Sequence, residues 1–140
     1  MTIAEKEKLL VEEFTLLGND WEARYEHIIE MGKELSGMEE TNKQDNYLIK
    51  GCQSKVWLTS KFENGKVLFQ ADSDAAIPKG IVAMMVRILS GQSPNAIVEA
   101  PLEFINEIGL KEHLSPTRAN GLVSMIKQMK LDALALKAKV

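Results

Sequence analysis

The chain has 140 residues, of which 45% are hydrophobic, and this suits one globular domain that buries roughly two-thirds of its unfolded surface. Its formal net charge of −3 argues against general nucleic-acid binding, which needs a concentrated basic face. The N-terminus lacks the apolar stretch of a signal peptide, no run is long enough to cross a bilayer, and one cysteine cannot form a disulfide framework. We therefore expect a single domain, residues 1–140, in the reducing cytoplasm.

Two amphipathic helices are expected at the N-terminal end. Thr2 and Glu5 have the spacing of a capping box, and apolar residues follow with helical periodicity. Asn19 and Glu22 repeat that spacing and are expected to open a second helix. The apolar stripe of this second helix consists of Trp21, Tyr25, Ile28, Ile29 and Leu35. The polar, charged stretch 36–46 that follows is expected to be a loop.

The dipeptide Asn64-Gly65, between two β-prone runs, predicts a type I′ hairpin that joins residues 55–62 to residues 66–71. The predicted register pairs Phe62 with Val67, Ser60 with Phe69, and Leu58 with Ala71. This register gives one largely apolar face, which a slip of one residue would turn to solvent. The run 47–49 is expected to supply a third strand.

After the hairpin the apolar period becomes helical, and Ser73 or Asp74 is expected to cap the next helix. Ser93-Pro94 and Ser115-Pro116 each have the form of an N-cap followed by proline at the first helical position. The order of elements predicts an α+β fold, in which helices pack on one face of a small three-stranded antiparallel sheet.

The single cysteine, Cys52, lies in the polar turn Gly51–Ser54, which is an unusual place for a residue that is normally buried inside an element. Glycine beside it removes bulk near the sulfur, and Lys50 and Lys55 flank the turn and favour the reactive thiolate. Without a second cysteine, the sulfur cannot form an intramolecular disulfide. Two interpretations are open at this point: inert packing, and chemistry that involves another molecule.

Other polar residues offer weaker candidate sites. His27 points away from its helix's apolar stripe and is expected to be solvated, and no spacing argument brings His113 to Cys52. A cysteine–histidine pair stays open because such pairs form in space. One cysteine and two scattered histidines lack the spacing of a zinc site, so no metal is expected. Asp72 and Asp74 fit either helix capping or acid–base and cation chemistry.

Arg118 is a separate case, because it falls in the first turn of the last helix. A cation there opposes the helix dipole, which points to a partner carboxylate or a binding role, with ordinary surface exposure as the alternative.

Three blocks of sequence occur in order along most of the chain. They are Gly51-Cys52-Gln53-Ser54-Lys55-Val56-Trp57-Leu58, then Asp72-Ser73-Asp74-Ala75 with Lys79-Gly80, and Leu114-Ser115-Pro116-Thr117-Arg118-Ala119-Asn120-Gly121-Leu122. Together they resemble the SufE family of sulfur acceptors, which work with cysteine desulfurases. Weaker matches lie on the second helix, at Tyr25, Ile28-Ile29 and Gly32. Lys55 and Pro78 depart from the residues common in the family.

The resemblance implies a fold related to the IscU-like scaffold proteins of iron–sulfur cluster assembly. It implies that Cys52 accepts persulfide sulfur from a pyridoxal-phosphate-dependent cysteine desulfurase of the SufS type and stimulates that enzyme. The sulfur then passes to a scaffold of the SufBCD type. The pyridoxal phosphate belongs to the partner, so this chain is expected to carry no cofactor and to be no stand-alone enzyme.

The resemblance also suggests roles for the residues around the thiol. Gly51, Gln53 and Ser54 would form the sulfur loop, and the amides of the latter two are expected to donate hydrogen bonds to a sulfur anion. Apolar residues such as Trp57 or Met84 are expected to cover the thiol until the partner engages.

Two further residues, Asp74 and Arg118, lie in the other matched blocks and are predicted to line the same face, where they serve docking or positioning. The main rival hypothesis is a single-cysteine thiol enzyme, such as a peroxidase or a hydrolase, and it requires a base near the sulfur. The other rival is a non-catalytic adaptor in which Cys52 is incidental.

Overall fold

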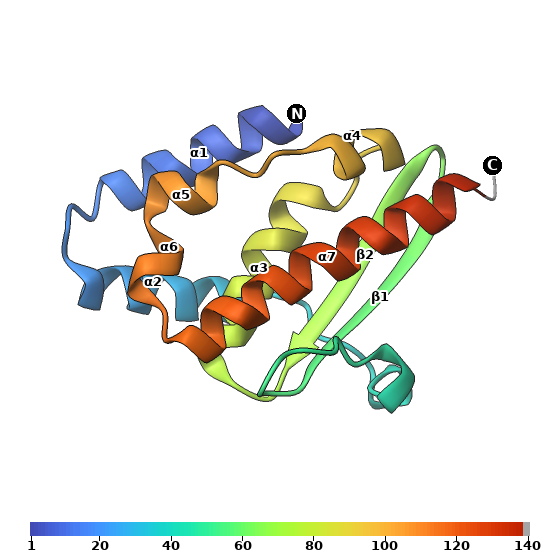
Figure 1. Ribbon diagram of the computed structural model, residues 1–140, viewed down its shortest axis with the longest axis horizontal. Helices are drawn as coiled ribbons and strands as arrows, with labels where there is room; N and C mark the ends of the chain where they lie inside the picture. Colours follow the sequence, from blue (N-terminus) through green and yellow to red (C-terminus); the bar gives the residue numbers. More distant parts are fainter. Residues whose placement is uncertain (139–140) are drawn as a thin grey trace.

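The structure, a computed structural model, describes residues 1–138, so the last two residues of the expected 1–140 domain lie outside this description. Helices pack beside a long β-hairpin, and the C-terminal helix runs across the hairpin (Figure 1). The elements in chain order are α1 (Ile3–Thr15), α2 (Trp21–Lys33), the 3-10 turns η1 (Glu40–Asn42) and η2 (Asp45–Tyr47), β1 (Val56–Glu63), β2 (Lys66–Ser73), α3 (Ala76–Leu89), α4 (Pro94–Glu99), α5 (Phe104–Ile108), α6 (Leu110–His113) and α7 (Pro116–Ala138).

The hairpin forms as the sequence predicts. Asn64 and Gly65 both have positive φ, at 53° and 78°, as a type I′ turn requires. The antiparallel register of β1 and β2 includes the pairs Leu58–Ala71, Ser60–Phe69 and Phe62–Val67. Most of these side chains, together with Val56, form one apolar face of the sheet, and α3 and α7 pack against the hairpin. The predicted α+β class, with helices packed against a small antiparallel sheet, is therefore confirmed.

The sheet of the described residues has two strands rather than the expected three. In the run 47–49, Leu48 makes a single isolated bridge with Trp57, and the Ile49 amide donates to the Val56 carbonyl at 2.8 Å. The run ends at once in the turn at Gly51, where φ is +93°. It is therefore too short to continue the ladder along β1.

Helix caps follow the expected chemistry with two corrections. The capping box of Thr2 and Glu5 is present. The second helix is capped by Asp20 rather than Asn19, because the Asp20 carboxylate accepts from the Ala23 amide at 3.2 Å. The third helix has no side-chain cap at its N-cap residue, Ala75, although a cap by Ser73 or Asp74 was expected.

The helices α2 and α3 approach each other so closely that their backbones touch. A Cβ atom on Gly80 would lie 2.1 Å from the Ile28 carbonyl oxygen, and one on Gly32 would lie 2.9 Å from the Gly80 amide nitrogen. The two glycines permit this contact and place the N-terminal half of α3 beside the cysteine loop. None of the helices within residues 1–138 has the length and apolarity needed to span a bilayer.

Candidate functional site

The turn that carries Cys52 lies directly on the surface of α7. The Cys52 thiol is half-buried and donates a hydrogen bond to the Gly121 carbonyl oxygen, with an Sγ–O distance of 3.6 Å. Gly51 is the glycine that this contact requires, because a Cβ there would lie 2.3 Å from Ser124 Oγ. A Cβ on Gly121 would lie 3.5 Å from the Cys52 sulfur, which is an ordinary contact. The left-handed backbone at Gly51 turns the chain so that the sulfur faces the helix.

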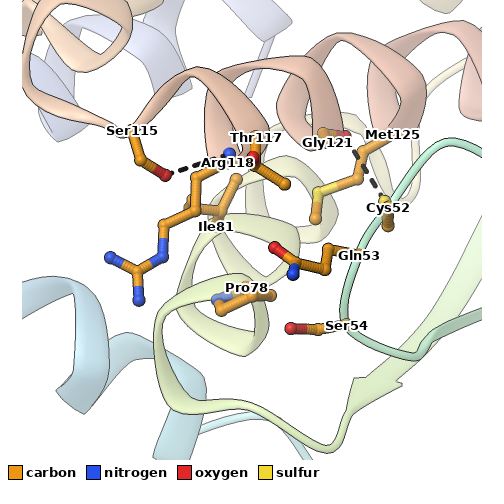
Figure 2. A pocket seen from close by; sticks show the side chains of 10 residues that line it. All are labelled: Cys52, Gln53, Ser54, Pro78, Ile81, Ser115, Thr117, Arg118, Gly121 and Met125. Atoms are coloured by element: carbon orange, nitrogen blue, oxygen red, sulfur yellow. Dashed lines mark hydrogen bonds between the residues drawn. The ribbon is translucent and has the colours of Figure 1, made fainter.

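A cavity of about 370 Å³ opens beside the sulfur (Figure 2). It is lined by Cys52, Gln53, Ser54, Pro78, Ile81, Ser115, Thr117, Arg118, Gly121 and Met125. The cysteine loop, the first half of α3 and the N-terminal part of α7 therefore share one hollow. The side chains of Cys52 and Arg118 lie on opposite sides of it.

The apolar wall of the cavity differs from the expected one. Pro78, Ile81 and Met125 supply it. Met84 is fully buried in the core, and Trp57 lies on the other face of the sheet from the buried Leu58, where the Lys43 ammonium is 5.6 Å from its ring centroid. The expectation that Trp57 or Met84 covers the thiol is therefore not supported by these positions.

Burial raises the pKa of the Cys52 thiol. The exposed Lys50 and Lys55, expected to favour the thiolate, do not outweigh this loss of solvation. The Gly121 carbonyl also acts only as an acceptor, so it favours the protonated sulfur. In this arrangement the resting cysteine is a sheltered thiol.

We expect this shelter to appear in the pH dependence of alkylation by iodoacetamide. Only the thiolate reacts, and burial raises the pKa of Cys52, so the thiolate of the folded protein becomes abundant at higher pH than that of the unfolded chain. The midpoint of the rate profile should therefore lie at higher pH for the native protein than for the same protein in urea. Equal midpoints, or a lower one for the native protein, would contradict this expectation.

Asp74 holds the end of the cysteine loop rather than lining the cavity. Its carboxylate accepts from the Lys55 amide at 3.0 Å, and its own amide donates to the Lys55 carbonyl at 3.2 Å. The Ser73 hydroxyl donates to the same carbonyl at 2.7 Å. These bonds fix the point where the loop becomes β1. Asp74 is exposed, so its surface remains available to a partner.

Asp72, the other carboxylate of this block, has a structural role. It is 5% exposed, and its carboxylate lies 3.2 Å from the Lys43 ammonium and 3.4 Å from that of Lys79. Burial opposes its ionisation, but the hydrogen bond from the Ser73 amide and the two lysines outweigh burial and lower its pKa. The ion pairs attach the segment before η2 to the sheet and to α3.

Neither histidine lies among the residues that line the Cys52 cavity. The His113 ring stacks on Trp21, with centroids 3.8 Å apart. His27 is partly buried, with Nε2 3.3 Å from the Glu13 carboxylate, so the expectation that it is solvated is wrong. Within residues 1–138, no cluster of histidine, cysteine and carboxylate side chains has the form of a metal site.

The third sequence block includes Gly121, but sequence reasoning did not predict that this part of α7 holds the cysteine loop. Gly121 and Ser124 lie under the loop, and Met125 lines the cavity. The available signal was Gly121 itself, because a glycine inside a long helix lowers helix stability relative to alanine and marks a position where another segment can approach the helix. The predicted loop residues Cys52, Gln53 and Ser54 do share the cavity with Arg118.

Comparison with known proteins agrees with the three blocks of sequence. A family model described as SufE, Fe-S metabolism associated domain, matches residues 8–133. The chain belongs to the SufE family. An uncharacterized SufE-like protein of Synechocystis is 41% identical over 118 residues, which cover 84% of this chain and 74% of that protein. Another from Rhizobium meliloti is 40% identical over 129 residues, covering 89% and 91% of the two chains.

The fold has a counterpart among solved structures. The solution structure of a hypothetical protein from Thermus thermophilus superimposes with a TM-score of 0.78 at 23% identity, over 95% of this chain and 96% of that one. At this identity the likeness supports the fold alone. Membership of the SufE family places the chain in iron–sulfur metabolism and implies a role in sulfur transfer.

Proposed function

We propose that this SufE-family chain accepts sulfur on Cys52 from the persulfide of a pyridoxal-phosphate-dependent cysteine desulfurase of the SufS type. It stimulates that enzyme and then passes the sulfur to an iron–sulfur scaffold of the SufBCD type. The observation that carries the proposal is the position of the thiol. The chain's single cysteine is half-buried beside a cavity, in the sequence block that matches the family.

The transfer step is an exchange at sulfur. The Cys52 thiolate attacks the outer sulfur of the desulfurase persulfide, the S–S bond breaks, and the enzyme's cysteine leaves as a thiolate. A new S–S bond then joins Cys52 to the transferred sulfur. The proton lost by Cys52 balances the one gained by the leaving thiolate or by solvent, and no external oxidant is required.

The surroundings of Cys52 suit a temporary carrier. With a single cysteine in the chain, no second thiol of the same molecule can attack the persulfide and release sulfide. The cavity beside Sγ offers room for one more sulfur atom, between the apolar side chains of Pro78, Ile81 and Met125. Burial raises the pKa of the thiol, so exposure of Cys52 when the partner docks would favour the reactive thiolate. Docking of the partner would then promote activation of the thiol.

Intact mass measurement tests the proposal. The reduced protein, incubated with an active SufS-type desulfurase and free cysteine, should gain one sulfur atom, and a reductant should remove it. The Cys52→Ser variant should gain none, because its hydroxyl cannot hold a persulfide. If the wild type also gains none while the desulfurase releases alanine, the acceptor role is wrong for that partner. A second desulfurase, from the same organism as this chain, then separates a wrong partner from a wrong function.

Arg118 and Asp74 are proposed to serve docking or positioning of the desulfurase. Arg118 is exposed at the rim of the cavity, where its charge can meet a partner carboxylate. Arg118→Ala is expected to lower stimulation of the desulfurase by roughly tenfold at limiting protein concentration, as loss of a charged interface contact does. Lys127→Ala, which removes an exposed cation elsewhere on α7, should leave stimulation intact. Full stimulation and transfer by Arg118→Ala would refute the assignment.

The thiol-enzyme alternative has less support. The residues of the described chain that line the cavity include no histidine or carboxylate to act as a base for Cys52. An adaptor role, in which Cys52 is incidental, predicts that Cys52→Ser still stimulates the desulfurase fully. The same assay therefore distinguishes the adaptor from the sulfur acceptor.

A further inference from the structure

Three neighbouring residues of α2 hold the segment that leads into α7. Arg24 Nη1 donates to the Ile108 carbonyl at 2.8 Å, at the end of α5. The Tyr25 hydroxyl donates to the His113 carbonyl, at the end of α6. The Trp21 ring stacks on the His113 ring with an angle of 9° between their planes. Side chains of α2 thus hold the last residue of α5 and the last residue of α6.

The segment that ends at His113 leads directly into the residues that line the Cys52 cavity. Two residues after His113, Ser115 caps α7, and its hydroxyl accepts from the Arg118 amide at 3.3 Å. The Ser115 carbonyl accepts from the Ala119 amide at 2.9 Å. Ser115 and Arg118 both line the cavity. A shift of the His113 carbonyl would therefore move the first turn of α7 and the guanidinium it carries.

We propose that Tyr25 is a positioning residue for the desulfurase-facing rim. Its hydroxyl holds the His113 carbonyl and so sets where Arg118 stands relative to Cys52. The proposal rests on the proposed function, in which Arg118 contacts the desulfurase. The Tyr25 ring packs separately against Trp21, with centroids 5.6 Å apart, so Tyr25→Phe keeps the packing and removes only the hydrogen bond.

A titration of desulfurase stimulation tests this role. Tyr25→Phe should raise the half-saturating concentration by roughly two- to tenfold, the range that one lost hydrogen bond corresponds to, and leave maximal stimulation unchanged. Tyr47→Phe makes the same chemical change on the chain's other tyrosine and should behave as the wild type. In an Arg118→Ala background, Tyr25→Phe should add nothing, because it acts through Arg118. An additive effect in the double variant would overturn the proposal.

Hydrogen exchange gives a readout that needs no partner. In Tyr25→Phe, the amides of Arg118 and Ala119 should exchange about two- to tenfold faster, whereas amides in the middle of α7 keep their rates. Unchanged exchange at the first turn, or faster exchange along all of α7, refutes the positioning role. If the wild type fails to stimulate any desulfurase, the proposed function is wrong. The exchange rates still test whether the Tyr25 hydroxyl positions the first turn of α7.

Discussion

Replacing Gly80 with alanine is expected to lower the free energy of unfolding by about 3 kcal/mol or more, a large part of a domain's total stability. The new Cβ would lie 2.1 Å from the Ile28 carbonyl oxygen and 2.5 Å from Ile28 Cγ2. Ile28 is fully buried and its backbone belongs to α2, so the contact cannot be relieved by a side-chain rotation. The two helices have to separate, and the measurement is urea unfolding followed by circular dichroism.

Gly121→Ala is the matched control for this prediction. Gly121 is also inside a helix, but its added Cβ would meet the Cys52 sulfur at 3.5 Å, an ordinary contact. Alanine is the better helix former by about 1 kcal/mol, so Gly121→Ala should be neutral or stabilising. If Gly80→Ala unfolds at the same urea concentration as the wild type, the close packing of α2 on α3 is not what stabilises the fold.

Gly51→Ala is expected to displace the cysteine loop while most of the fold persists. At φ of +93° an alanine is strained, and its Cβ would lie 2.3 Å from Ser124 Oγ. We expect a loss of stability of about 1–3 kcal/mol and a loop lifted from α7. Cys52 then loses burial, its pKa falls, and alkylation by iodoacetamide at pH 7 should be faster than in the wild type, because a larger fraction of the sulfur is thiolate.

Gly65→Ala separates backbone strain from the contact with α7. Gly65 also has a positive φ, at 78°, but nothing lies within 4 Å of its added Cβ, and it belongs to the hairpin turn. This variant should lose similar stability and keep the slow alkylation of Cys52. Adding Ser124→Gly to Gly51→Ala should restore part of the protection, because it removes the atom that the new Cβ meets. Unaltered Cys52 alkylation in Gly51→Ala would show that the loop does not depend on this contact.

The parts of the fold that were predicted correctly are those that neighbouring residues determine. Asn64-Gly65 fixes the turn, and the turn fixes the register of both strands. The prediction of a third strand was wrong, because the apolar pattern of residues 47–49 does not indicate that the chain turns at Gly51, directly after this run. The cap of α2 was misplaced by one residue because Asn19 and Asp20 are both good caps, and only the backbone path selects between them.

The loop residues of the candidate site were predicted correctly as lying together, but most of the residues that surround the loop were not predicted. Cys52, Gln53 and Ser54 are adjacent in sequence, whereas the α7 surface beneath them comes from about 70 residues further on, and a long-range contact of this kind leaves little trace in local patterns. Trp57 is a different case. The predicted register, with Leu58 on the buried face, already placed Trp57 on the opposite face, so the sequence held the information that excludes it as a cover for the thiol.

The bond between Cys52 and α7 depends on what the sulfur carries. The Gly121 carbonyl oxygen has lone pairs and no hydrogen, so at 3.6 Å it attracts Sγ only while the sulfur keeps its proton. Once that proton leaves, two electron-rich atoms face each other and the attraction becomes a repulsion. The closed loop is thus a property of the protonated thiol. In the proposed persulfide, Sγ is bonded to the transferred sulfur and has no hydrogen to donate, so the hydrogen bond that held the loop on α7 is lost.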